Sequence, residues 1–393
     1  MSELFYDPSS IDYPIVDADA HVNEPPELWQ ERVPQRLRER APKVVRTEKG
    51  EFWSFEDGKE LWPVGLTAVA GMSYLDFKPI GMGYADIRPG SFETGPRLAD
   101  MDADGIYAQV LYPSVTLRGA NVYSGERDLQ LACVRAYNDW IGEFCEGSDG
   151  RLIPQGIIPT TGVEDAGAEL ERSLKVGHRG VIISSFPNGS LEPREEDESF
   201  WGLAQEADVP VAVHIGSFMG GRPVGGGRRR GIDWSSLSFL GKAAWTKAGG
   251  QTLGVVCDLL FAGIYDRFPR LKILLVEANI GWIPTLLEQA DDMFRRYRWY
   301  SGAVAKMTMP SEIFMRHFWA TFMLDSVGVE MRHRMNLRHI MWSTDYPHSG
   351  SDWPDSRITL ERVFRGVPRD EVKLMLHTNC KELYHLDHIP QSL

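Results

Sequence analysis

Short apolar runs alternate with amphipathic segments along most of the chain. The runs are rich in Val, Ile and Leu, as buried strands are, and eight of them span residues 15–19, 108–112, 152–158, 180–184, 209–214, 272–277, 319–324 and 340–345. Between them, apolar residues recur at helical spacing, for example over 129–145, 163–175, 254–262 and 282–297. Strands that alternate with helices predict a parallel sheet. Eight such units favour a closed (β/α)8 TIM barrel, with an open doubly wound sheet as the alternative.

Two stretches interrupt this alternation, and both follow a predicted strand end. Residues 39–93 are rich in Gly, Pro and aromatic residues, and residues 216–250 contain a Gly-Gly-Gly-Arg-Arg-Arg tract. Long loops after barrel strands commonly form lids or pocket walls, although a surface excursion or an oligomer contact remains the alternative. Since no linker stands out elsewhere, we expect one barrel domain over 1–393, with large inserted loops after strands 1 and 5.

Composition and charge restrict the kind of partner. The chain has 393 residues, a net charge of −13 and 43% hydrophobic residues, which suits an acidic globular enzyme with a small-molecule substrate. The negative charge argues against nucleic acid or an anionic membrane as the main partner. Four widely spaced cysteines argue against a disulfide framework. Without an apolar leader or a spanning segment, a cytoplasmic location is expected, and a homodimer is plausible.

Polar residues follow three of the predicted strands at their carboxyl ends. The first strand runs into Asp17-Ala-Asp19-Ala-His21, the fifth ends at His214, and the eighth ends at Asp345. Alternate residues of a strand share a face, and the carboxyl ends of barrel strands meet in one pocket. Together these imidazoles and carboxylates predict ligands for a divalent metal. Taken singly, His214 would more often be a hydrogen-bonded structural residue, and Asp345 more often a turn or helix-cap residue.

Several segments together resemble the metal-dependent amidohydrolase superfamily, in particular the amidohydrolase 2 branch that is similar to aminocarboxymuconate-semialdehyde decarboxylase. The segments that carry the resemblance are VDADAHVNEP at 16–25, RLADMDADG at 97–105, RLIP at 151–154, VPVAVHIG at 209–216, DRFPRLK at 266–272, GWIP at 281–284 and STDYPH at 343–348. They cover nearly the whole chain in order.

The resemblance implies a (β/α)8 barrel that holds one metal ion. The implied ligands are Asp19, His21, His214 and Asp345, and Asp17 aligns with an acidic residue that supports the ligand pair. Zinc is the main expectation for such a mixed imidazole and carboxylate site, with manganese or iron as alternatives.

The chain departs from the family in one respect that matters for the reaction. Many members place a histidine at the end of strand six, where this chain has Ala278. Glu277 or Asn279 would then have to supply a polar group there, although Glu277 is equally a loop anchor. Strand four ends in Ser184-Ser185-Phe186, with no lysine to bridge two metals, which favours a single ion.

Three functions compete. The main expectation is hydrolysis of an amide, ester or lactone by metal-activated water, with Asp345 as general base and His214 beside it as a further catalytic residue. The alternative is a nonoxidative decarboxylase or hydratase that acts on a carboxylated aromatic or enoic acid. The missing strand-six histidine favours hydrolysis. A third possibility is a binding protein that has lost catalysis, against which the four-ligand set argues.

Further residues are predicted to contact the substrate, each with a structural alternative. They are Glu24, Arg118, Glu277, Asn279 and His348. Arg118 would face a substrate carboxylate or remain solvated. Glu24 would reach the metal surroundings or cap a helix start, and His348 would touch the substrate or hold its loop.

Overall fold

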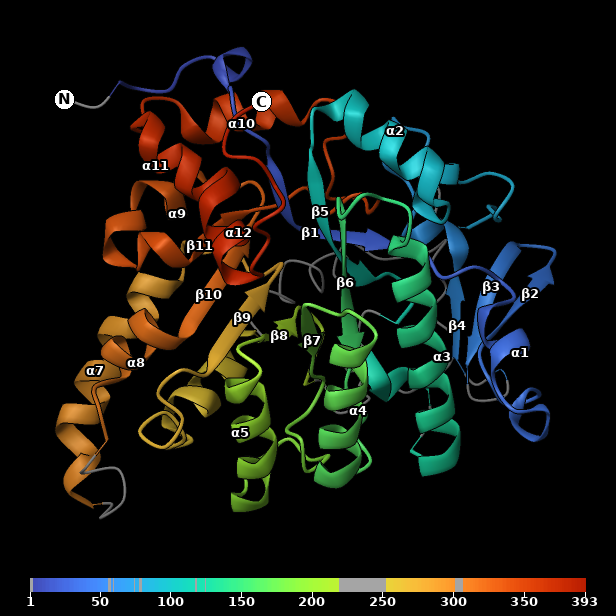
Figure 1. Cartoon of the computed structure of the whole chain (residues 1–393), viewed down its shortest axis with the longest axis horizontal. Coiled ribbons are helices and arrows are strands. Elements are labelled where there is room, and N and C mark those ends of the chain that lie inside the picture. Colours follow the sequence, from blue (N-terminus) through green and yellow to red (C-terminus); the bar gives the residue numbers. More distant parts are fainter. Residues whose placement is uncertain are drawn as a thin grey trace.

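A single parallel sheet of eight strands organises the molecule (Figure 1). The computed structural model describes residues 3–55, 58, 60–73, 75–77, 80–116, 119–123, 125–218, 252–300 and 307–393. The strands, in their spatial order, are β1 (Val16–Val22), β5 (Ala108–Pro113), β6 (Leu152–Ile157), β7 (Gly180–Ile182), β8 (Pro210–His214), β9 (Lys272–Val276), β10 (Phe318–Phe322) and β11 (Ile340–Trp342). All eight predicted strands are confirmed, with ends that shift by a few residues.

Backbone hydrogen bonds join the first strand to the segment that follows the last one. The amide of Asp345 donates to the carbonyl of Asp19 at 3.0 Å, and the amide of His21 donates to the carbonyl of Tyr346 at 2.6 Å. These bonds bring the two ends of the sheet together, as a barrel requires. The barrel prediction is therefore confirmed, and the open doubly wound sheet is wrong.

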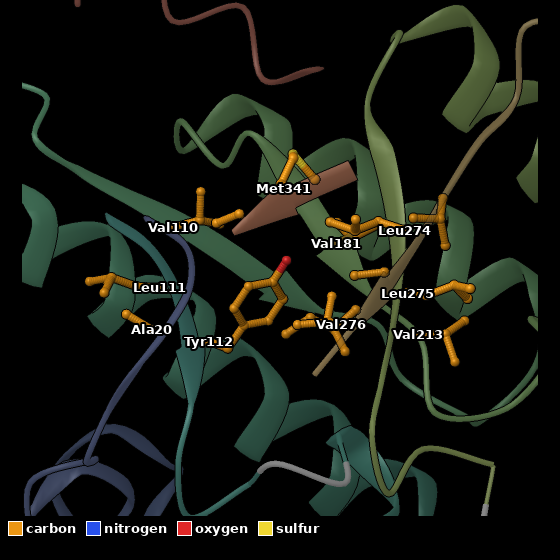
Figure 2. Packing of buried hydrophobic residues seen from close by; sticks show 14 of the residues in the cluster. Ala20, Val110, Leu111, Tyr112, Val181, Val213, Leu274, Leu275, Val276 and Met341 are labelled. Carbon is orange, nitrogen blue, oxygen red and sulfur yellow. The ribbon is translucent and has the colours of Figure 1, made fainter. Parts of the chain in front are cut away.

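The strands read as continuous apolar runs because both of their faces are covered. Every residue of β1, β5, β6 and β8 is buried. Figure 2 shows buried side chains of β5, β7, β8, β9 and β11 packed close together, among them Val110, Val181 and Met341. Because both faces of the strands are packed with apolar side chains, polar functional groups are expected at the strand ends.

Helices cover the outside of the sheet (Figure 1). They are α1 (Leu28–Arg32), α2 (Thr94–Asp104), α3 (Arg127–Cys145), α4 (Val163–Lys175), α5 (Glu198–Glu206), an unlabelled helix at 252–261, α7 (Ile283–Tyr297), α8 (Pro310–His317), α9 (Ser326–Glu330), α10 (Ser356–Phe364), α11 (Arg369–Lys373) and α12 (Asn379–Leu383). The four helices predicted from apolar spacing are all present. In α4, for example, Ala166 and Leu170 face inward, while acidic residues begin the helix and basic residues end it, as its dipole favours. Within the described part of the chain, no helix combines the length and apolarity that crossing a bilayer demands.

The segment between β1 and β5 carries a small sheet of its own. Its antiparallel strands are β2 (Lys43–Thr47), β3 (Gly50–Phe55) and β4 (Glu60–Pro63), in that order, and they lie beside the barrel in Figure 1. The sheet connects to the core through Trp53, whose ring packs edge-on against Trp29 at 5.1 Å between centroids. Sequence reasoning did not predict these strands. Most of the other predicted insertion, residues 219–250, lies outside the described residues.

Candidate active site

Four buried side chains converge at the carboxyl end of the barrel, and we call them the ligand cluster: Asp19, His21, His214 and Asp345. His21 lies at their centre, because its Nε2 is 3.4 Å from Asp19 Oδ1 and 3.3 Å from Asp345 Oδ1. The Nε2 atom of His214 lies 3.6 Å from the same Asp19 oxygen. Residues that are up to 326 positions apart in the sequence therefore share one site, as the strand-end prediction requires.

The local backbone explains how Asp345 reaches the cluster. Strand β11 stops at Trp342, and Asp345 has a left-handed conformation with φ of +56°. Few residues other than glycine adopt this conformation, although aspartate does so more readily than most. The hydrogen bond from its amide to Asp19 holds the turn against β1. The predicted strand at 340–345 is thus wrong in its last three residues, since the chain turns there toward the site.

Both cluster histidines direct Nε2 toward the carboxylates. The Nδ1 of His21 lies 2.9 Å from the carbonyl of Pro113, and the Nδ1 of His214 lies 3.1 Å from the carbonyl of Ile215. A carbonyl oxygen only accepts hydrogen bonds, so each Nδ1 carries the proton. Each Nε2 is then an unprotonated donor atom. Metal-binding histidines are commonly oriented in this way.

The cluster atoms that face one another have no hydrogen-bond partner. Among the described residues, these are both carboxylate oxygens of Asp19, Nε2 of His21 and of His214, and Oδ1 of Asp345. Buried polar atoms are nearly always paired, so a group of unpaired ones requires an explanation. A divalent cation provides it, since imidazole nitrogen and carboxylate oxygen are ligands that Zn²⁺, Mn²⁺ and Fe²⁺ share. The donor set therefore fits the metal that the resemblance implies.

The pKa values of these groups are shifted because several ionisable side chains lie close together and away from water. Burial raises the pKa of Asp345 well above its usual range, and the carboxylates of Asp19 and Asp17 add to the effect. Burial also lowers the pKa of His21 well below its usual value. For His214, burial acts to lower the pKa, but contact with Asp19 outweighs it and the pKa is raised. A bound cation would relieve the repulsion between the carboxylates.

Beneath the cluster lies a second polar group that we call the supporting layer: Asp17, Arg97, Gln109 and Thr344. The Asp17 carboxylate accepts hydrogen bonds from the Asp19 amide at 3.2 Å, the Thr344 amide at 2.9 Å, the Thr344 hydroxyl at 2.5 Å and the Gln109 amide group at 3.0 Å. Burial still raises its pKa to about 7. Asp17 thus joins β1 to the segment that carries Asp345, in line with the supporting role that the resemblance implies.

Arg97 extends this layer from helix α2. Its guanidinium group donates to Gln109 Oε1 at 2.7 Å and to the carbonyl of His21 at 2.5 Å, and its side chain is fully buried. Sequence reasoning placed Arg97 in a family segment but assigned it no role. The signal that marked it was a charged residue on the inward face of a helix, where buried arginines are normally paired.

Glu24 lies close to the cluster in sequence, but its carboxylate has other partners. One oxygen accepts from the amide of Val115, and the other accepts from the amide and the hydroxyl of Thr116. Burial raises the pKa of Glu24 to about 7, although these hydrogen bonds oppose the shift. Glu24 therefore anchors the loop after β5. The helix-cap alternative is wrong, since α1 begins at Leu28 after Glu27.

Glu277 and Asn279 follow β9, where many family members have a histidine. Glu277 Oε2 lies 3.9 Å from His214 Nδ1, and neither this oxygen nor Asn279 Oδ1 has a hydrogen-bond partner within the described residues. Both residues have positive φ, +57° and +54°. Burial raises the pKa of Glu277 well above its usual value, and the charge of Asp345 adds to this. Ala278 between them is buried among apolar residues.

The last two predicted substrate contacts have different outcomes. His348 lies beside the cluster, with Nδ1 2.9 Å from Asp345 Oδ1 and Nε2 3.1 Å from the hydroxyl of Ser114. Burial, together with His214, lowers the pKa of His348 to about 3, so the ring is neutral. Arg118 lies outside the described residues. Its predicted contact with the substrate carboxylate stays a prediction.

Comparison with known proteins identifies the family. The amidohydrolase family model, of the amidohydrolase 2 branch, matches residues 16–386, which confirms the resemblance. Decarboxylase orsB of Emericella nidulans is 27% identical over 271 residues, covering 65% of this chain and 74% of that protein. The 2-amino-3-carboxymuconate-6-semialdehyde decarboxylase of Dictyostelium discoideum is 22% identical over 273 residues, covering 68% of this chain and 70% of that protein.

Solved structures agree on the fold. An amidohydrolase from Mycobacterium avium subsp. paratuberculosis superimposes with a TM-score of 0.73 at 17% identity, covering 95% of this chain and 100% of the other. A dihydroxybenzoic acid decarboxylase from Polaromonas sp., with bound manganese and the inhibitor 2-nitroresorcinol, gives a TM-score of 0.61 at 18% identity, covering 95% and 98%. At these identities the likeness supports the barrel and nothing finer.

Proposed function

This chain belongs to the amidohydrolase family, and on that premise we propose that it is a metal-dependent nonoxidative decarboxylase of a carboxylated aromatic acid. The observation that carries the proposal is the ligand cluster, with its unpaired and buried donor atoms at the barrel mouth. The matched relatives named above are decarboxylases, which favours this reaction over the hydrolysis expected from the sequence. The proposal therefore gives these relatives more weight than the absence of a strand-six histidine, which favoured hydrolysis.

One divalent ion would be held by Asp19, His21, His214 and Asp345. Two imidazoles and two carboxylates suit Mn²⁺ as well as Zn²⁺, and manganese occupies the Polaromonas decarboxylase. When bound, the ion would act as a Lewis acid toward the oxygens of the substrate. The expectation of zinc thus widens to either metal.

The chain's own residues would supply the proton. In the reaction the bond between the ring carbon and the carboxylate breaks, CO₂ leaves, and the ring carbon gains a proton in its place. Asp345 is the first candidate to deliver this proton, because its carboxylate lies in the cluster, 3.3 Å from His21 Nε2, where the substrate carboxylate would be held. Glu277 is the second candidate, because burial raises its pKa well above the usual value and it lies next to Ala278, where the family histidine would stand.

Two unpaired oxygens would orient the substrate. Glu277 Oε2 and Asn279 Oδ1 are buried without a partner after β9. An unpaired buried acceptor is costly, and a substrate that donates a hydrogen bond removes that cost. Ring hydroxyl groups next to the carboxylate would serve this purpose. We therefore expect hydroxylated benzoates to react faster than benzoate itself.

The test uses metal-depleted protein reconstituted with Mn²⁺ or Zn²⁺ and a panel of hydroxybenzoates in D₂O. We expect CO₂ release, with one deuterium at the carbon that carried the carboxylate. The Asp345→Asn variant should lose both the metal and the activity, whereas Glu277→Gln should keep the metal. The exposed variant Arg46→Ala serves as the matched control. Incorporation of ¹⁸O from labelled water into amides or esters, without CO₂ release, would instead support the hydrolase.

A further inference from the structure

The ligand cluster spans a seam in the barrel. Asp19 and His21 belong to β1, whereas Asp345 follows β11. These two strands are the ends of the hydrogen-bonded strand order, so within the described residues no ladder joins them. His21 Nε2 lies 3.3 Å from Asp345 Oδ1 across this seam. The spacing of the ligands therefore depends on what holds the two segments together.

The insertion at 39–93 reaches the β1 side of the seam through Asn23, which lies two residues after His21. Only 2% of Asn23 is exposed. Its side-chain amide donates to the carbonyl of Thr67 at 3.1 Å, and the Thr67 hydroxyl donates to Asn23 Oδ1 at 2.7 Å. The backbone amide of Asn23 donates to the carbonyl of Ser91 at 2.8 Å. Three hydrogen bonds thus fix Asn23 to the insertion.

The same part of the insertion reaches the β11 side of the seam. The amides of Val69 and Ala70 both donate to the carbonyl of Pro347, at 2.9 and 3.0 Å. Pro347 lies two residues after Asp345, and the side chains of Val69 and Ala70 are buried. Residues 67–70 therefore span the seam, and on each side they bind a residue two positions from a ligand of the cluster.

We propose that residues 67–70 and Asn23 form a clamp that sets the spacing of the metal ligands across the seam, with Asn23 and Thr67 as positioning residues. The proposal rests on the metal site of the proposed function, but it does not depend on the reaction that occurs there. Ligands bind an ion most tightly when the chain already holds them at the right spacing, because binding then requires no further ordering. The clamp gives the insertion a role at the barrel mouth.

Hydrogen exchange of the wild-type protein tests the clamp without any substitution. A clamp that favours metal binding must itself be favoured by bound metal, because coupling between two sites is reciprocal. We expect the amides of Val69 and Ala70 to exchange at least about 5-fold more slowly with saturating Zn²⁺ than without it. Exchange in the β2–β3 turn, at 47–50, should be the same in both states and serves as the internal control. Equal exchange of the clamp amides in both states would overturn the proposal.

Metal affinity, measured by competition between the protein and a chelator for Zn²⁺, gives a second test. Thr67→Val keeps the shape of the side chain but leaves Asn23 Oδ1 buried without its donor, so the dissociation constant should rise about 5-fold or more. Thr67→Ser restores the hydroxyl and should restore the affinity. Thr47→Val is the matched control, because the Thr47 hydroxyl donates to the carbonyl of Gly50 in an exposed turn of the same insertion. The melting temperature of each metal-free variant checks that it folds.

The visible absorption of Co²⁺-loaded protein separates positioning from mere stability. These bands depend on ligand geometry, so Thr67→Val should shift them, whereas a less stable protein that is fully loaded would keep them unchanged. Unchanged affinity, or bands identical to those of wild type, would overturn the clamp even if CO₂ is released. Clamp effects in a protein that decarboxylates no substrate would support the clamp and overturn the decarboxylase. A protein that binds no metal would overturn both.

Discussion

Two aspartates of strand β1, two residues apart and both fully buried, have opposite surroundings. Asp17 in the supporting layer accepts four hydrogen bonds, from Asp19, Gln109 and Thr344. Asp19 in the ligand cluster accepts none, and its nearest polar neighbours are imidazole nitrogens at 3.4 and 3.6 Å. The same residue type on the same strand is therefore paired at one position and unpaired two residues later.

The difference distinguishes buried polar groups that hold the fold together from those that serve a binding site. A paired buried carboxylate stabilises the fold, whereas each unpaired buried group costs about 1–3 kcal/mol. A chain keeps such a cost where an absent partner, here a cation, removes it. Substitutions in the two regions should therefore have opposite effects on the metal-free protein.

The largest effect is expected from removing an unpaired ligand. Asp19→Asn should weaken metal binding by more than about 100-fold, beyond the range for residues that only orient ligands, and CO₂ release should fall with it. The metal-free variant should be as stable as wild type or more so, because a repelling buried charge is gone. Metal analysis and urea unfolding measure the two quantities. Full metal content in this variant would remove Asp19 from the cluster.

Glu24 is a paired carboxylate outside the supporting layer. We expect it to make the stability of the metal-free protein depend on pH. Its pKa in the folded protein is raised from 4.5 to about 7. The folded state then binds the proton more tightly than the unfolded state does, so the stabilisation is complete below pH 4.5 and is lost as the pH rises through 7. Metal-free wild type should lose up to about 3 kcal/mol over this range relative to Glu24→Gln. Parallel pH profiles for the two proteins would contradict the shift.

Asp17→Asn should change the stability of the metal-free protein in the opposite direction to Asp19→Asn. An amide replaces one acceptor oxygen by a donor that opposes the amide and hydroxyl donors around it, so unfolding of the metal-free protein should become easier by about 1–3 kcal/mol. Metal affinity should fall by about 10-fold to 100-fold, because Asp19 and the turn that carries Asp345 lose their support. Thr344→Val, which removes a single donor, is the milder matched variant. An unchanged urea midpoint for Asp17→Asn would mean that the supporting layer does not stabilise the fold.

An exposed ion pair should have the smallest effect. Arg32 donates two hydrogen bonds to Glu143 and joins α1 to α3, but water surrounds much of both side chains. Arg32→Ala should lower the free energy of unfolding by less than about 1 kcal/mol. Metal content should not change. A loss as large as that of Asp17→Asn would show that burial does not decide which polar pairs matter.

The alternation of apolar runs and amphipathic segments predicted the barrel well. This pattern arises from burial, and each strand shows it in its own residues. All eight strands and four of the helices were visible in this way. The local backbone conformation was harder to predict from the sequence. The turn that carries Asp345 into the cluster depends on a left-handed backbone and on a hydrogen bond to Asp19, more than 300 residues earlier, and a pattern of apolar residues carries neither.

The members of the ligand cluster were predictable because each stands at a strand end. Asp17 was also expected as a support, but Arg97 and Ser114 were not, since they act through partners that are remote in sequence. Glu24 was predicted near the substrate from its distance to His21 along the chain, but its partners lie about 90 residues later, at Val115 and Thr116. Proximity in sequence thus suggested contacts that the fold directs elsewhere.

A crystal of the protein soaked with Mn²⁺ and measured near the manganese absorption edge tests the central claim most directly. The account predicts one anomalous peak per chain, at roughly 2.0–2.3 Å from Asp19, His21, His214 and Asp345. A crystal of the Asp19→Asn variant, treated identically, should show no such peak. Absence of a peak in the wild-type crystal, or a peak away from these four residues, would contradict a metal centre here.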